Sequence, residues 1–400
     1  MKKNRTMTAE RPIPEVFRRF ALPVLAVLLT APALACVLEA PQDPAPTPQE
    51  AKHQEELKRD VELGKKYAEQ VEKELTLSKD EALIERVQRI GNELAQISRE
   101  HYIPATWGDK RHNVFDYTFK VVEDEDVNAF SIPGGFIYVN TGLLKFVQSD
   151  DELAAVLAHE IAHAANRHLI TLSKQQEQTQ LFTLPVVIAA LLAGSTRDAN
   201  IALIGQDLLL TALTSGWSQE AETDADRTGF YYMTYSKYNP VALLTFMERL
   251  AFKERNAPRF DLGILRTHPP SRIRAEKLKA LLKQNNIPIQ RSKVTTDFRV
   301  QAIPEQEGVR LQFGEEYLFT LRGPNATERA NEALPILNDF FDSVPQVFEV
   351  AALSNRLLGR GKTLILFEPQ DDADGANAAA LKAESNMKRA LYRLAFRINW

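Results

Sequence analysis

The chain has 400 residues, with 49 basic and 53 acidic side chains and a formal net charge of −4. This length allows one substantial domain and a smaller one, and a weakly acidic chain without a basic block is not expected to bind nucleic acid. Cys36 is the single cysteine, which excludes a disulfide framework and a thiolate metal site.

Residues 1–35 have the pattern of a signal peptide. Basic side chains gather in residues 1–20, and the following apolar stretch from Phe20 to Leu34 is short for a membrane span. Ala33-Leu34-Ala35 suits a general signal peptidase, whereas Cys36 suits a lipoprotein site whose cysteine carries lipid. Both cleavages remain open. We expect an exported protein of the periplasm or cell envelope, either free or anchored as a lipoprotein.

The next segments are a tether, two helices and a hairpin. Residues 36–50 are rich in Pro, Gln and Ala, which is typical of a flexible tether. Residues 49–100 predict two helices with a break near 76–79. Residues 136–139 are rich in strand formers and follow Pro133-Gly134-Gly135, so 128–143 predicts a hairpin.

His159-Glu160-Ile161-Ala162-His163 predicts a metal site. Residues 150–158 are rich in helix formers, and positions i and i+4 of a helix share one face. His159 and His163 can therefore bind one Zn²⁺ per chain together. Glu160 is rotated away from that direction, which suits a general base acting on the attacking water.

A helix over 217–227 supplies the third ligand. Glu222 is expected to bind the metal, and Asp226, one turn later on the same face, to accept a hydrogen bond from a ligand histidine. Glu220 and Asp224 fall on another face and are expected to be exposed.

The remaining chain is predicted in three parts. The apolar segments within 181–213 are too short to span a bilayer, and either form buried core or a lid that touches the membrane or the cleft. Residues 240–285 are helical. Residues 292–400 predict strands at 309–313 and 363–367 and helices at about 325–343 and 375–397. This β-α-β-α order faintly resembles peptidoglycan-binding domains, although their motif residues are missing.

Four blocks in this order resemble one zinc metallopeptidase family, which includes the CAAX prenyl proteases and the HtpX-type heat-shock proteases. The chain is most similar to its soluble bacterial envelope branch. The blocks are residues 127–143, the zinc motif with Asn166-Arg167-His168 after it, Glu222 with Ala225-Asp226-Arg227, and His268-Pro269-Pro270-Ser271-Arg272-Ile273-Arg274.

The resemblance implies further roles. The strand at 136–139 would edge the cleft, where an extended substrate could add to it, with Asn128 and Ala129 as substrate-binding residues. His268 would either stabilise the oxyanion or occupy the fourth metal position in a latent state, and Arg274 would hold the nearby carboxylates or the substrate carbonyl. His168 is interpreted as structural.

These observations predict a zincin-like α+β fold. A mainly helical metallopeptidase domain (51–288), with a hairpin beside the active-site helix, precedes a small C-terminal α/β domain (292–400) of unknown role. The expected activity is zinc-dependent endopeptidase cleavage, and the resemblance implies misfolded or unassembled envelope proteins as its substrates. Lipidated Cys36 or the apolar 181–213 segments could contact a membrane surface. The alternatives are an assembly factor with a latent protease site and a cell-wall-binding protein.

Overall fold

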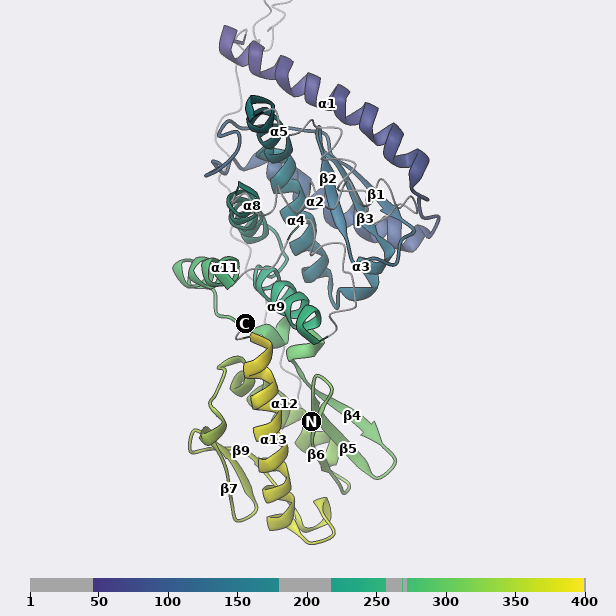
Figure 1. Cartoon of the computed structure of the whole chain (residues 1–400). Coiled ribbons are helices and arrows are strands. Elements are labelled where there is room, and N and C mark those ends of the chain that lie inside the picture. The colour runs from purple at the N-terminus through teal and green to yellow at the C-terminus, as the bar shows by residue number, and fades with distance from the viewer. Residues whose placement is uncertain (1–45, 180–216, 257–267, 269–271, 399–400) are drawn as a thin grey trace, which may run out of the picture. The chain divides into compact units, whose positions relative to one another are not determined.

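Two long helices precede the first sheet. The computed structural model describes residues 46–179, 217–256, 268 and 272–398. Helix α1 (Pro48–Glu74) and helix α2 (Glu81–Glu100) confirm the predicted pair and its break (Figure 1). Asp80 begins α2 by accepting hydrogen bonds from the main-chain nitrogens of its first turn. The tether predicted over 36–50 is too long at its end, because α1 starts at Pro48.

The first sheet has three strands in the order β1-β3-β2. Strand β3 (Phe136–Asn140) pairs parallel with β1 (Thr118–Val122) and antiparallel with β2 (Ala129–Ile132), which confirms the hairpin. Gly134 and Gly135 form its turn with φ of 80° and 89°, values that favour glycine. The expectation that 136–139 edges the cleft is wrong, because β3 is the central strand and both its edges are paired. The edge strand of the hairpin is β2.

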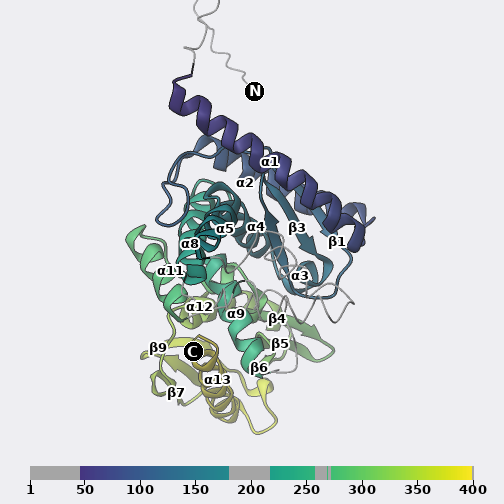
Figure 2. The same cartoon turned by 45° about the horizontal axis from the view of Figure 1, so that its top comes forward.

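Helix α4 (Asp150–Ala165) follows the short helix α3 (Thr141–Phe146) and is the centre of the fold. Ser149 caps it, accepting a 3.2 Å hydrogen bond from the nitrogen of Glu152. Most of its side chains are buried, because α2, α8 and α9 (Figure 2) and also β2 pack against it. A helix surrounded in this way holds its polar side chains inside the protein.

Three further helices complete the hydrophobic core that surrounds α4, here called the first core. They are α8 (Trp217–Thr234), α9 (Val241–Asn256) and α11 (Arg272–Gln284). They confirm the helices predicted over 217–227 and within 240–285. Helix α8 lies along α4, and α11 packs on α8 and α9. Helix α5 (His168–Thr179) starts directly after a turn at Arg167, whose φ is +52°. That turn ends α4 and starts α5 in a new direction.

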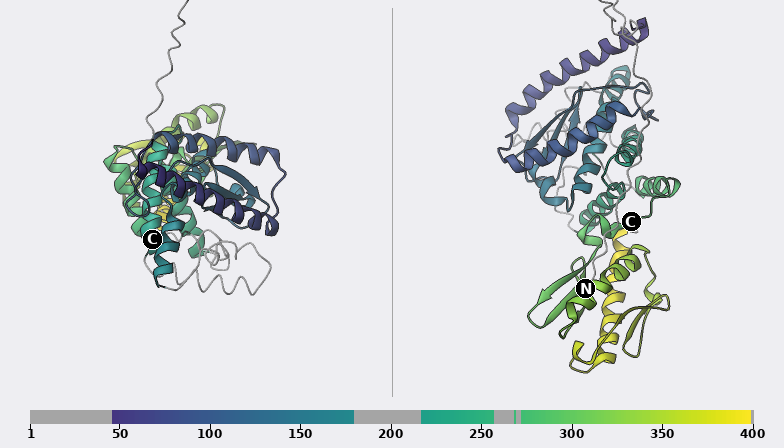
Figure 3. Two further views of the ribbon diagram at one scale, coloured as in Figure 1. Left: turned by 90° about the horizontal axis from the view of Figure 1, so that it is seen from above. Right: turned by 180° about the vertical axis from the view of Figure 1, so that it is seen from behind.

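The C-terminal part contains two three-stranded antiparallel sheets and two long helices. Of these two C-terminal sheets, β4-β5-β6 is followed by α12 and β7-β8-β9 is followed by α13. Their bounds are β4 Val300–Glu305, β5 Gly308–Phe313, β6 Glu316–Leu321, α12 Ala326–Asp342, β7 Val350–Leu353, β8 Arg356–Gly359, β9 Lys362–Leu366 and α13 Ala376–Ile398. Helix α13 packs against both sheets (Figure 3). One separate hydrophobic cluster, running from Phe298 to Ile398, fills this part.

Both predicted C-terminal helices and both predicted strands are present, but four strands were missed. Strand β4 contains Pro304, which weakens a strand pattern, and β7 and β8 have four residues each. Short strands of mixed polarity carry too little periodic signal to be identified alone. The order is therefore β-β-β-α-β-β-β-α, not β-α-β-α. The helix content and small sheets confirm the predicted α+β class.

Several predictions concern residues outside the described ranges. The signal peptide, Cys36 and the apolar segments of 181–213 belong to these. Within the described ranges, none of the helices combines the length and the apolarity that a membrane crossing requires.

Candidate metal centre

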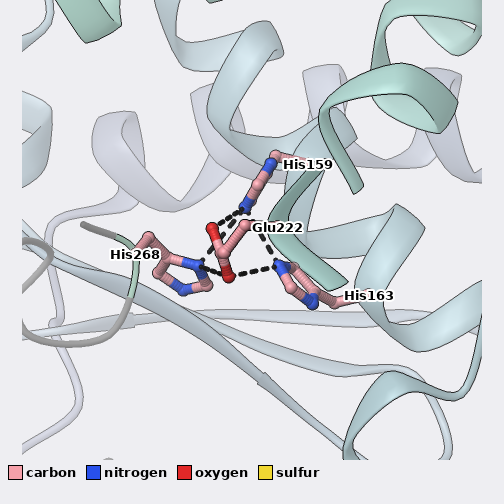
Figure 4. A group of neighbouring side chains, drawn as sticks. All are labelled: His159, His163, Glu222 and His268. Carbon is pink, nitrogen blue, oxygen red and sulfur yellow. Dashed lines mark hydrogen bonds and ion pairs between the residues drawn. The ribbon is translucent and has the colours of Figure 1, made fainter. Parts of the chain in front are cut away.

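Four side chains from three parts of the chain meet inside the first core (Figure 4). His159 and His163 come from α4, Glu222 from α8, and His268 from the segment before α11. One potential ligand atom from each lies within 4.8 Å of all the others. The Nε2 atoms of His159 and His163 are 3.0 Å apart, and Nδ1 of His268 is 3.3 Å from Nε2 of His159. The helical i, i+4 spacing thus brings both imidazoles to one point.

Glu222 faces all three imidazoles. Its Oε1 is 2.9 Å from Nδ1 of His268 and 3.2 Å from Nε2 of His163, and its Oε2 is 3.3 Å from Nε2 of His159. Burial by itself would raise the pKa of Glu222, but His268, Arg274 and His163 hold it well below its usual range. The carboxylate is therefore ionised.

The chemistry of this cluster fits a divalent metal ion. Three imidazole nitrogens and one carboxylate converge, and such nitrogen and oxygen donors suit a first-row metal. The negative charge nearby is strong. Although burial disfavours its charged form, hydrogen bonds to Asp226 and Glu222 raise the pKa of His159 to about 10. A bound cation would replace that proton.

Asp226 and Arg274 form a second layer around the cluster. Oδ1 of Asp226 is 3.0 Å from Nδ1 of His159, on the side of the ring away from the other ligands. Arg274 donates to both oxygens of Asp226, at 2.7 and 2.8 Å, and its Nη1 is 3.0 Å from Oε2 of Glu222. Of the two roles considered for Arg274, these contacts favour holding the carboxylates. Paired charges of this kind fix ligand orientation.

Glu160 is almost completely buried, with an exposed fraction of 1%. Its Oε1 is 3.4 Å from Nε2 of His268, at the edge of the cluster. Burial raises the pKa of Glu160, while the charges of His268 and His159 oppose this. A buried carboxylate of raised pKa beside the cluster can accept a proton and release it again.

The prediction for Asp224 is wrong. Glu220 is exposed as expected, but Asp224 is fully buried and accepts hydrogen bonds from the main chain and hydroxyl of Thr106, both at 2.6 Å, and from Nδ2 of Asn166 at 2.5 Å. Helical geometry alone assigns one buried face to α8. A second face is buried because the segment around Thr106 and the turn after α4 cover it.

His168 is closer to the cluster than its spacing suggested. Five residues after His163, it would point away if α4 continued, but α4 ends at Ala165 and the turn at Arg167 redirects the chain. Nδ1 of His168 then lies 2.9 Å from Nδ1 of His163. In the sequence, the only indication of this turn was that Asn166-Arg167-His168 belongs to one of the blocks that carry the family resemblance.

The two proposed substrate-binding residues are both buried. Ala129 belongs to the hydrophobic core and pairs with Val139 of β3, so its side chain does not line a cleft. Asn128 is 2% exposed, and its Oδ1 has no hydrogen-bond partner among the described residues. The outer edge of β2 instead presents main-chain hydrogen-bonding groups, because no described strand pairs with that side of β2.

A pocket opens beside the cluster between α4 and α9. Its polar walls come from cluster residues and their partners, and the remainder is apolar. The lining residues are Ala155, Val156, His159, Glu160, Asp226, Leu243, Phe246, Met247, Leu250, His268 and Arg274. An apolar side chain can therefore lie next to Glu160.

Several known proteins are similar to this chain in sequence. The chain is 25% identical over 284 residues to the beta-barrel assembly-enhancing protease of Escherichia coli (strain K12), covering 68% of this chain and 56% of that protein. It is 32% identical over 167 residues to the mitochondrial metalloendopeptidase OMA1 of Schizosaccharomyces pombe, covering 42% and 47%. It is 31% identical over 175 residues to the metalloprotease LoiP of Escherichia coli (strain K12), covering 42% and 64%.

The chain thus spans about half the length of the first of these relatives. The family model of peptidase family M48 matches residues 82–282, a range that contains all but the first residue of α2, the β1-β3-β2 sheet and the whole His159–His268 cluster. This confirms the family inferred from the four sequence blocks, and a metal centre belongs to its chemistry. The chain is a member of peptidase family M48.

Proposed function

We propose that this protein is a zinc-dependent endopeptidase of the bacterial cell envelope. One observation carries the proposal: His159, His163 and Glu222 converge within the geometry of a metal site, and the buried carboxylate of Glu160 lies beside them, 3.4 Å from Nε2 of His268. These three side chains would hold the ion, and the family match supports peptide bonds as the target.

The roles of the residues follow from their contacts. A bound divalent ion would polarise the scissile carbonyl and lower the pKa of water. Glu160 would take the proton of the attacking water and pass it to the leaving amine, for which its raised pKa suits it. Asp226 and Arg274 would hold His159 and Glu222 in place during the reaction.

The structure also supports a manner of substrate binding. An extended peptide could pair with the outer edge of β2, which packs against α4. Main-chain pairing is independent of sequence, and the pocket beside Glu160 would accept an apolar side chain. Unfolded chains present both features. We therefore propose misfolded or unassembled envelope proteins as substrates, in keeping with the name of the similar beta-barrel assembly-enhancing protease.

Two substitutions separate metal binding from proton transfer. Glu160→Gln keeps every proposed ligand, so we expect about one metal ion per chain and a loss of casein cleavage of at least about a hundredfold. Glu222→Ala removes a ligand and should lose both metal and cleavage. Elemental analysis and casein digestion with and without a chelator measure these quantities.

Glu220→Ala is the matched control, because this glutamate is exposed on the same helix. Normal cleavage by Glu160→Gln would overturn the assigned base, and full metal content in Glu222→Ala would overturn the assigned ligand. Metal binding by the wild-type chain without any chelator-sensitive cleavage would favour an assembly factor with a latent site.

A further inference from the structure

The two helical histidines of the cluster are held in different ways. Each must present a bare nitrogen to a metal ion, so the proton of each ring must be on its other nitrogen. For His159 that nitrogen faces a carboxylate, Asp226, at 3.0 Å. For His163 it faces another imidazole, because Nδ1 of His168 lies 2.9 Å away. A given imidazole nitrogen, unlike a carboxylate oxygen, accepts a hydrogen bond in only one of the two neutral tautomers of its ring.

The surroundings of His168 determine which form it adopts. Its Nε2 is 3.1 Å from Oδ2 of Asp224 and 3.2 Å from the carbonyl oxygen of Trp107. A carbonyl oxygen can only accept a hydrogen bond, and so can an ionised carboxylate. The proton of neutral His168 must therefore be on Nε2. Its Nδ1 then carries a lone pair directed at His163.

Asp224 is built as an acceptor. Besides His168, it receives hydrogen bonds from Thr106 and Asn166, and Nη2 of Arg227 lies 3.4 Å from its Oδ1. The main-chain N–H and the hydroxyl of Thr106 and the amide NH2 of Asn166 all act as donors here, so both carboxylate oxygens of Asp224 accept. The carboxylate therefore offers an oxygen lone pair to Nε2–H of His168.

The directions of the hydrogen bonds are therefore consistent from His163 through His168 to Asp224. Nε2–H of His168 donates to Asp224, and Nδ1–H of His163 donates to Nδ1 of His168. Nε2 of His163 is left bare, and it is this atom that lies 3.2 Å from Oε1 of Glu222 in the cluster. All three side chains are buried or nearly so, which limits competition from water.

We propose that His168 is a positioning residue for the metal centre: it is the acceptor that fixes the metal-binding tautomer of His163, and Asp224 fixes that of His168. The inference rests on the proposed function, since it assumes that His163 binds a metal. It assigns to the turn after α4 a part in metal affinity in addition to its part in folding.

Two amide substitutions test the two nitrogens of the His168 ring separately. The Oδ1 atom of asparagine can occupy the place of Nδ1, so His168→Asn keeps an acceptor for His163 and loses the bond to Asp224. The Nε2 atom of glutamine can occupy the place of the ring Nε2, so His168→Gln keeps the donor to Asp224 and loses the acceptor. If His168 only supports the fold around Asp224, the glutamine variant should be the better substitute.

The proposal predicts the opposite order for metal binding. In the full-length protein, the zinc dissociation constant, measured by competition with a chromogenic chelator, should rise about 10- to 100-fold in His168→Gln and far less in His168→Asn. The visible spectrum of the cobalt-loaded protein should change in His168→Gln alone. Unfolding midpoints show whether each variant folds. Wild-type zinc affinity in folded His168→Gln, or weaker binding by His168→Asn than by His168→Gln, would overturn the proposal.

A measurement on the wild-type protein applies even if both variants fail to fold. Long-range ¹H–¹⁵N spectra of the zinc-loaded chain should show a protonated Nε2 and a bare Nδ1 on His168. A proton on Nδ1 of His168 would refute the inference. Failure of the proposed function would look different, because the wild-type chain itself would then bind no zinc or cleave no protein.

Discussion

His268 has two possible roles, a fourth metal ligand in a latent state or a donor to the oxyanion, and they predict opposite effects of its replacement. Its Nδ1 lies among the ligand atoms of His159, His163 and Glu222, and its Nε2 lies 3.4 Å from Glu160. An imidazole in the fourth position would close the site and leave no place for the attacking water. The geometry therefore favours latency over oxyanion stabilisation as the role of His268 in this arrangement.

Replacing His268 should therefore activate the enzyme. We expect His268→Ala to increase basal casein cleavage several-fold, because the fourth position becomes free, whereas loss of an oxyanion donor would lower turnover by about a hundredfold. Initial rates at equal metal content measure the difference. His101→Ala is a control, since this ring stacks on Tyr235 outside the cluster. A clear decrease in His268→Ala would show that His268 assists the reaction.

The ionisation of Asp224 should make the free energy of unfolding depend on pH in the acidic range. Its pKa falls from 3.8 to about 2 in the folded protein, where hydrogen bonds from His168 and Thr106 outweigh the effect of burial. A folded pKa below the unfolded one stabilises the protein above about pH 4, and this stabilisation is lost as the pH falls toward 2.

We therefore expect metal-free Asp224→Asn to differ from wild type most above pH 4. The difference in unfolding free energy should shrink by about 2 kcal/mol between pH 5 and pH 2. Urea unfolding at several pH values measures it, and Glu220→Gln on the exposed side of α8 is the control. A difference that stays constant with pH would contradict the role of the Asp224 carboxylate.

At the scale of elements, the site depends on how closely α8 approaches α4. Gly229 lies at the crossing, where a Cβ atom would be 3.1 Å from the carbonyl carbon and 3.2 Å from the oxygen of Ala158. Because this position carries no side chain, the two helices can approach closely. Glu222 is two turns earlier on α8, so the same approach brings its carboxylate to the histidines of α4.

The turn between α4 and α5 has a comparable effect. Arg167 adopts a φ of +52° and donates two hydrogen bonds to Asp60 of α1, at 2.6 and 3.0 Å. The guanidinium is buried, so this pairing replaces the water that it loses on folding. It anchors the turn that directs His168 toward His163.

At the scale of the whole molecule, buried ion pairs join the peptidase region to the C-terminal part. Arg249 on α9 pairs with Glu152 of α4 and, at 2.9 Å, with Asp297 just before β4. Arg291 pairs with Glu248 at 2.8 Å. Removing one partner of such a pair would leave a buried charge uncompensated. A domain boundary between residues 288 and 292 remains our proposal, and it would lie within this bonded region.

Location in the cell is also a property of the whole molecule. If Cys36 carries lipid, Cys36→Ser should move the protein from the membrane fraction to the soluble envelope fraction, because the acyl chains supply the anchoring energy. Fractionation and immunoblotting of both proteins test this. Soluble wild-type protein would instead favour cleavage after Ala33-Leu34-Ala35 and a free periplasmic enzyme.

The sequence by itself determined the local features of this protein. The spacing of His159 and His163 sets one helical face, and Glu222 and Asp226 share a face for the same reason, so the cluster could be predicted without a structure. Most helices were also predictable, because apolar periodicity and capping residues act within a few neighbours. The family resemblance added His268 and Arg274, which local patterns do not indicate.

The tertiary structure alone decided how the surroundings of the cluster are built. Asp224 is buried because a distant segment covers the second face of α8, and His168 reaches His163 because a turn of positive φ interrupts the helical spacing. The central place of β3 likewise follows from its pairing with β1, which lies before the hairpin in the chain. The burial of Asp224 and the place of β3 depend on contacts between residues far apart in sequence, and the turn before His168 is anchored by Asp60 of α1. Local periodicity contains no information about such contacts.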